Sequence, residues 1–215
     1  MKRIVYHHAD EDGWACAAII KQQHPEAEMV SCVHGQGVEF VSGYDEVYVV
    51  DYCFAPEEMR RLRDSNARFI WIDHHESAMK RIKEEYEGIR DASKAGCELT
   101  WKYMHKDRTP PRIISHIADE DIWRFSDDCS APFNLYLNAL FHQGHEIDVI
   151  LSILNSFKEA DYEQAYQHGT LIEQFRSSQI KTQLGRGIKT IFLGHKATLF
   201  FSNINTSHLG NAALA

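Results

Sequence analysis

The sequence predicts an α/β fold in which a parallel sheet carries helices on both faces, followed by a helical linker and a partial second α/β unit. Short apolar runs alternate with longer helical patterns at the start of the chain, an order that is typical of parallel sheets. Two of the runs, VYVV and FIWI, are apolar without interruption, as strands covered on both faces must be. After about residue 94 the pattern becomes almost wholly helical.

The first part of the chain is predicted to contain four strands and two helices. The strands cover residues 4–6, 29–33, 47–50 and 69–72. One helix is predicted at 14–23 and another at 56–66. The second begins with Pro56, and the two glutamates in its first turn face the positive end of the helix dipole. Because helices join successive strands, we expect right-handed crossovers between parallel neighbours.

The remainder is predicted to hold five helices and two short β-like runs. The helices cover residues 95–104, 111–120, 133–141, 147–157 and 158–184. The sequence LGRG ends the last helix, and β-like runs follow at 190–193 and 198–202. We therefore predict three units, at residues 1–130, 131–186 and 187–215. An open sheet edge at 198–202 would pair with another chain, which predicts a homo-oligomer.

Composition indicates a globular protein that we expect in the cytoplasm. The 215 residues are 44% hydrophobic, enough for one full core and a small second unit. The net charge of -8 argues against binding of long duplex nucleic acid, which normally requires a basic surface, so any phosphate binding must be local. Five scattered cysteines without a CxxC pair are typical of reduced thiols. No apolar run approaches the ~20 residues of a membrane span, so no membrane contact is expected.

Polar side chains follow three of the predicted strands, at the edge where parallel α/β sheets bind ligands. The clusters contain His8, Asp10 and Asp12 after the first strand, Asp51 after the third, and Asp73, His74 and His75 after the fourth. Strand alternation would point the first three side chains the same way, with Gly13 turning the chain into the helix. Buried together without a cation, these carboxylates would repel one another. The sequence therefore predicts a metal site.

The donor set favours two divalent cations. Carboxylate oxygens mixed with imidazole nitrogens suit Mn²⁺ better than Ca²⁺, with Mg²⁺ and Co²⁺ as alternatives. The four aspartates of the clusters carry a charge that two divalent ions would balance. Such a pair of ions clamps the attacking and leaving oxygens of a phosphoryl group. Phosphoester hydrolysis is the chemistry that follows.

The order HxDxDG, a lone aspartate after an apolar strand, and DHH after another resembles the DHH phosphoesterase superfamily over about residues 1–125. The resemblance implies a DHH catalytic domain at 1–130 and a partial C-terminal DHH-associated domain at 187–215. It implies hydrolysis of phosphodiester bonds in short oligonucleotides or dinucleotides by a hydroxide that bridges two metals. The alternatives are an exopolyphosphatase or pyrophosphatase-like enzyme that cleaves polyphosphate or another phosphoanhydride, and a catalytically weak, truncated nucleotide-binding form. The last arises because the family's glycine-rich motif ending in histidine is absent from the sequence.

The resemblance also implies residue roles. The first metal would be bound by His8 and Asp10, the second by Asp12, His74 and Asp121, and both by Asp51. His75 would face the substrate phosphate, and Asp73 would orient a histidine. The fourth motif of the family matches IADEDIW, in which Asp121 is favoured by its spacing to the aromatic residues that follow, and Asp119 is the alternative. In the stretch AGCE at 95–98, the backbone would approach a phosphate, or Cys97 would simply pack inward at a helix start.

Overall fold

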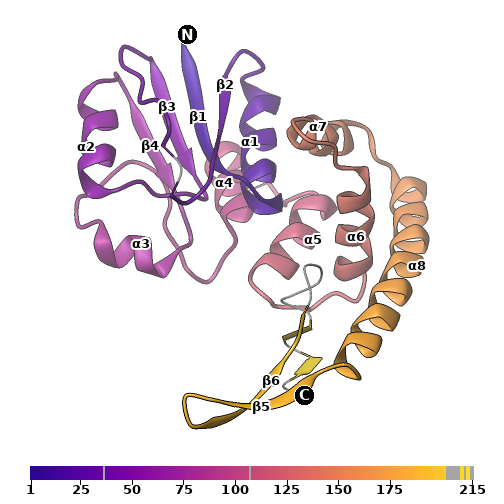
Figure 1. Ribbon diagram of the computed structural model, residues 1–215. Helices are drawn as coiled ribbons and strands as arrows, with labels where there is room; N and C mark the ends of the chain where they lie inside the picture. The colour runs from indigo at the N-terminus through magenta and orange to yellow at the C-terminus, as the bar shows by residue number, and fades with distance from the viewer. Residues whose placement is uncertain (36, 107, 202–208, 211, 214–215) are drawn as a thin grey trace.

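The α/β class is confirmed by the computed structural model, which describes residues 1–35, 37–106, 108–201, 209–210 and 212–213. Four parallel strands form one sheet in the order β2-β1-β3-β4. They are β1 (Arg3–His8), β2 (Glu28–Cys32), β3 (Glu46–Val50) and β4 (Phe69–Ile72). Each overlaps a predicted strand, and their carboxyl ends share the lower edge of the sheet in Figure 1.

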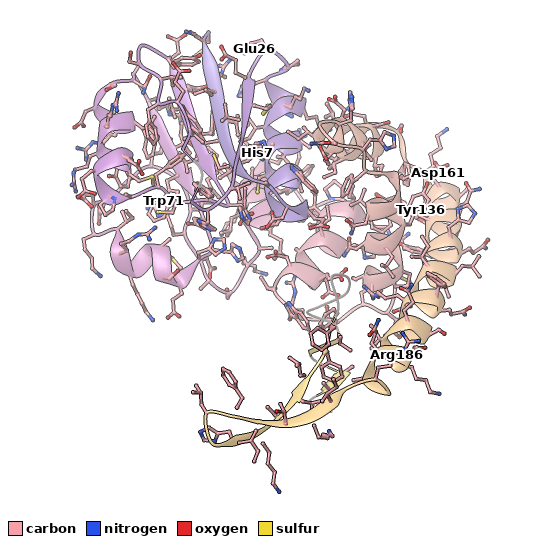
Figure 2. All side chains as sticks on the ribbon, in the orientation of Figure 1. His7, Glu26, Trp71, Tyr136, Asp161 and Arg186 are labelled. Carbon is pink, nitrogen blue, oxygen red and sulfur yellow. The ribbon has the colours of Figure 1, made fainter. Side chains whose placement is uncertain are left out.

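Helices cover both faces of this sheet (Figure 1). One face carries α2 (Pro56–Asp64) and α3 (Glu76–Arg81), and the other carries α1 (Glu11–Gln23) and α4 (Gly96–His105). Alternate strand residues serve the two cores: Val5 and Ile70 face α1, whereas Trp71, labelled in Figure 2, faces the opposite core. Because both faces are buried, VYVV and FIWI have no polar positions. The short helix α3 is an element that the sequence did not predict.

Four further helices extend the core on the α1 side. They are α5 (Arg112–Asp121), α6 (Ser130–Leu140), α7 (Glu146–Ser156) and α8 (Glu159–Leu184). Phe133, Ile150 and Tyr162 belong to the same buried cluster as strand residues such as Val5. Helix α8 packs closely on α6, since a Cβ at Gly169 would lie 1.8 Å from the carbonyl oxygen of Pro132. The predicted helical linker is therefore packed into the first core, while the predicted domain boundaries stay a prediction.

A hairpin of two antiparallel strands follows α8. It consists of β5 (Ile188–Phe192) and β6 (His195–Leu199), and it extends away from the helices in Figure 1. β6 starts three residues before the predicted run at 198–202, whose last residue lies outside the described ones. Homo-oligomer formation through this edge stays a prediction. Among the described residues, no helix has the length and apolarity required to cross a bilayer.

The junction of β1 and α1 differs from the sequence prediction. The helix begins at Glu11 because Asp10 caps it, its Oδ1 accepting a hydrogen bond of 3.0 Å from the backbone N–H of Gly13. Asp12 consequently lies in the first helical turn, so strand alternation was the wrong reason to group these side chains. Gly13 is a helical residue, and a Cβ there would lie 2.3 Å from the carbonyl oxygen of His8. The close approach of helix and strand, rather than a turn, requires this glycine.

Candidate metal centre

Asp51 lies at the centre of the polar side chains that converge at the carboxyl edge of the sheet. It follows β3 directly and is only 1% exposed. Its Oδ1 lies 3.2 Å from Nε2 of His74 and 3.9 Å from Nδ1 of His75, both of which follow β4. Its Oδ2 lies 3.9 Å from Nδ1 of His8 at the end of β1. The two oxygens thus face histidines from two different strands.

The potential metal donors form two main groups around Asp51. The first contains His8, Asp10 and Asp51, and the second contains Asp12, His74 and Asp121. Within each group the donor atoms lie no more than 4.8 Å apart. Asp51, His74 and His75 form a third, overlapping group. The structure therefore brings together all six predicted ligands, in the two sets that the family resemblance implied, and their role as ligands stays a prediction.

Asp51 shows why this cluster suits a cation. Neither of its carboxylate oxygens has a hydrogen-bond partner among the described residues. Burial, followed by the charges of Asp12 and Asp10, raises the pKa of Asp51 well above its usual value. Its backbone is also left-handed, with φ of 50°, a conformation that costs on the order of 1 kcal/mol. A bound divalent ion would satisfy both oxygens, so the residues present fit the predicted metals.

The amino terminus of α4 positions Asp12. The backbone N–H groups of Gly96 and Cys97 donate to the two oxygens of its carboxylate, at 2.7 and 2.8 Å. The helix dipole adds to this stabilisation of a negative charge. A Cβ at Gly96 would lie 2.8 Å from Oδ2 of Asp12 and 2.9 Å from Cβ of Asp51. These amides thus bind a side chain of the centre, and Cys97 packs inward, fully buried.

Asp73 holds His75 by its side chain and the loop by its backbone. Oδ1 of the buried Asp73 accepts hydrogen bonds from Nδ1 of His75 at 2.7 Å and from the backbone N–H of His74 at 2.8 Å. The first of these bonds raises the pKa of His75, whose side chain is 40% exposed. His74 is more enclosed, and burial lowers its pKa. The geometry agrees with the orienting role that was predicted for Asp73.

The two aspartates of the fourth motif face different surroundings. Oδ2 of Asp121, at the end of α5, lies 3.7 Å from Nε2 of His74. Burial and the charge of Asp12 raise the pKa of Asp121 to about 8. Asp119 instead accepts hydrogen bonds from the hydroxyl of Ser126 at 2.6 Å and from backbone N–H groups of the loop after α5, including that of Asp127. These bonds outweigh burial and lower the pKa of Asp119 to about 2. Asp121 therefore lies at the centre, and Asp119 stabilises a loop.

A comparison with protein families gives the same assignment as the motifs. The sequence model of the DHH family, N-terminal domain, matches residues 2–120, more than half of the chain. The chain belongs to the DHH family. The matched region includes His8, Asp10, Asp12, Asp51 and the DHH sequence itself. Membership does not separate the oligoribonuclease type from the exopolyphosphatase type.

Individual relatives of this DHH protein are distant. The uncharacterized protein R106 of Acanthamoeba polyphaga mimivirus is 23% identical over 151 residues, covering 62% of this chain and 36% of that protein. This chain thus spans about a third of the length of that curated relative. A crystal structure of an uncharacterized protein from Helicobacter pylori G27 covers 100% of this chain and 79% of its own, at 15% identity and a TM-score of 0.49. RecJ in complex with Mn²⁺ from Thermus thermophilus covers 86% and 37%, at 15% identity and a TM-score of 0.40. Family membership therefore rests on the match at residues 2–120.

Gly96→Ala should weaken manganese binding by at least about tenfold, because the added Cβ would displace the carboxylates of Asp12 and Asp51. Isothermal titration calorimetry with Mn²⁺ measures the effect. Gly185→Ala is the matched control, since a Cβ there would make an ordinary contact of 3.5 Å with the carbonyl oxygen of Thr182. Equal affinity in the two variants would show that the α4 terminus does not position the centre.

Asp119→Asn should lower the free energy of unfolding by about 2 kcal/mol at neutral pH, because it removes a carboxylate whose pKa is depressed by hydrogen bonds. That stabilisation is complete above the unfolded pKa of about 4 and is lost as the pH falls towards 2. Urea denaturation should therefore show the difference from the wild type shrinking over this range. A difference that is independent of pH would contradict the ionic origin.

Asp121→Asn should instead weaken manganese binding by at least about tenfold, because the substitution removes a negative oxygen donor beside His74. Calorimetry on both variants distinguishes the two aspartates. Asp119→Asn should keep the number of ions that the wild type binds. Loss of binding in Asp119→Asn, with normal binding in Asp121→Asn, would show that the fourth motif had been assigned to the wrong aspartate.

Proposed function

We propose that this chain is a two-metal phosphoesterase that hydrolyses phosphodiester bonds of short oligonucleotides or dinucleotides, with Mn²⁺ as its preferred ion. The coarser function, a metal-dependent phosphoesterase, is supported by membership of the DHH family. The observation that carries the two-metal proposal is the carboxylate of Asp51. It is buried without hydrogen-bond partners among the described residues, and each of its oxygens faces one of the two donor groups. A carboxylate in that position is suited to bridge two cations.

The proposed ligand sets follow the two donor groups. One ion would be held by His8 and Asp10, the other by Asp12, His74 and Asp121, and both by Asp51. Two divalent ions in such a site supply an activated water and neutralise charge on the phosphoryl oxygens. The amides of Gly96 and Cys97 keep Asp12 ionised and oriented for its ion.

His75 would bind the substrate phosphate. Its Nδ1 is fixed by the hydrogen bond to Asp73, which leaves Nε2 as the nitrogen available to a ligand. The raised pKa of His75 favours the imidazolium form, which donates a proton from both nitrogens. Nε2 would then donate a hydrogen bond to a non-bridging phosphate oxygen and offset its charge.

Aromatic and amide side chains beside Asp121 support a nucleotide substrate. A cavity of about 220 Å³ is lined by Asp121, Trp123, Asn134 and Asn138. Trp123 is 47% exposed and Phe125 is 43% exposed, with their rings 5.3 Å apart. Exposed rings are suitable surfaces for base stacking, and amides suit the hydrogen-bonding edges of a base. A pure phosphoanhydride substrate would use neither feature.

Asp51→Ala should abolish manganese-dependent release of mononucleotide from a short oligoribonucleotide, with a loss of at least about a hundredfold in turnover, because both donor groups lose their shared carboxylate. Asp128→Ala, at an exposed aspartate outside the centre, is the matched control and should retain activity. Each protein is assayed at the same bound manganese content.

The outcome decides between substrate classes. Absence of mononucleotide release by the wild type with manganese bound, together with release of orthophosphate from polyphosphate, would replace the nucleotide proposal by phosphoanhydride hydrolysis. Turnover of neither substrate would favour a nucleotide-binding protein without catalysis. Equal activity in Asp51→Ala and the wild type would exclude this centre as the site of the reaction.

A further inference from the structure

A groove beside α4 concentrates positive charge on an otherwise acidic protein. It has a volume of about 370 Å³ and is lined by four cationic side chains, those of Lys94, Lys102, Lys106 and Arg108. The whole chain, by contrast, carries a formal charge of -8. The groove therefore provides local binding of phosphate where the overall charge opposes it.

Most of these cations are available to a ligand. Lys102, Lys106 and Arg108 form no ion pair with any residue in the described ranges. The two acidic side chains of the lining have partners of their own. Glu98 lies 3.3 Å from Arg124 and 3.8 Å from Lys94, and Asp91 accepts hydrogen bonds from the hydroxyl and the backbone N–H of Ser93.

The shape of the groove distinguishes it from a helix end that merely attracts lysines. Cations near a helix carboxyl terminus are favoured by the dipole, which accounts for Lys102 and Lys106 individually. Lys94 precedes α4 and Arg108 follows it, so the dipole explains neither. The indole Nε1 of Trp101 donates a hydrogen bond of 2.9 Å to the carbonyl oxygen of Arg108. This bond holds the segment after α4 against the helix and gives the groove a fixed wall.

One end of the groove adjoins the metal centre. The backbone N–H of Asp91 donates to the carbonyl oxygen of Asp73, and α4 begins with the amides that bind Asp12. From Gly96 the helix rises roughly 9 Å to reach Lys102. A single strand whose scissile phosphate lies at the centre can therefore continue over α4 and place later phosphates among the cations.

We propose that the groove lined by Lys94, Lys102, Lys106 and Arg108 binds the phosphodiester backbone of an oligonucleotide beyond the bond that is cleaved. This inference rests on the proposed function. Lysine and arginine side chains along a groove bind successive phosphates without reading the bases. A dinucleotide is too short to reach the groove from the centre, so the groove favours longer substrates.

The test replaces three unpaired cations by neutral residues of similar length, in the variant Lys102→Gln/Lys106→Gln/Arg108→Gln. All three side chains are exposed, so the fold should be retained. The matched control is Lys181→Gln/Arg186→Gln/Lys189→Gln, which removes the same charge from α8 and the hairpin; Arg186 is labelled in Figure 2. Steady-state kinetics are measured with a dinucleotide and with an oligoribonucleotide of about ten nucleotides. Fluorescence anisotropy measures binding of a labelled phosphorothioate analogue of the longer strand.

With the longer strand, the groove variant should show a KM raised at least about tenfold and an unchanged kcat, because three phosphate contacts are lost. The slope of log affinity against log salt should become shallower by about 2. The dinucleotide should be cleaved as by the wild type, and the control variant should behave as the wild type with both substrates.

Three results would overturn the groove proposal. The first is an unchanged KM for the longer strand, which leaves dinucleotide hydrolysis and hence the proposed function intact. The second is an equal loss in both variants, which would indicate a long-range effect of net charge. The third is a loss confined to polyphosphate, which would assign the groove to a phosphoanhydride chain. If the wild type cleaves no phosphodiester, anisotropy still decides: weaker binding by the groove variant alone supports the groove while the proposed function fails.

Discussion

The mutual repulsion of buried carboxylates is the constraint on which this structure depends. Asp51 is enclosed beside Asp10 and Asp12, and within the described part of the chain it has neither a hydrogen bond nor an exposed surface to relieve its charge. Protein interiors do not tolerate such a group without a compensating cation or a proton. The parallel sheet produces the crowding, because its carboxyl ends direct three loops to one edge. The fold thus creates an electrostatic need that divalent ions meet.

Local compensation explains why the cluster is stable enough to form. The α4 amides stabilise Asp12, the loop after α5 stabilises Asp119, and Asp73 is held by its own loop. Each carboxylate except Asp51 and Asp121 has backbone donors or a histidine beside it. The least compensated groups are therefore those between the two donor sets, where positive charge is most effective.

The sheet and the candidate ligands could be predicted from the sequence because their signals are local. A continuously apolar run identifies a buried strand, and a polar residue directly after it identifies the carboxyl edge, as for Asp51. Other features depend on tertiary contacts that no local pattern records. The binding of Asp12 by Gly96 joins residues 84 positions apart, and the left-handed backbone of Asp51 follows from packing. Helix α3 is a single short segment with little periodicity, which is why it was missed.

The donor groups are drawn from widely separated parts of the chain, from His8 at the end of β1 to Asp121 at the end of α5. During synthesis the first three aspartates leave the ribosome well before their last partner. A nascent chain can therefore hold only an incomplete set of donors until α5 has emerged and docked. Ion loading thereby reports completion of folding, so a cell that supplies manganese late selects chains whose first 121 residues are already assembled.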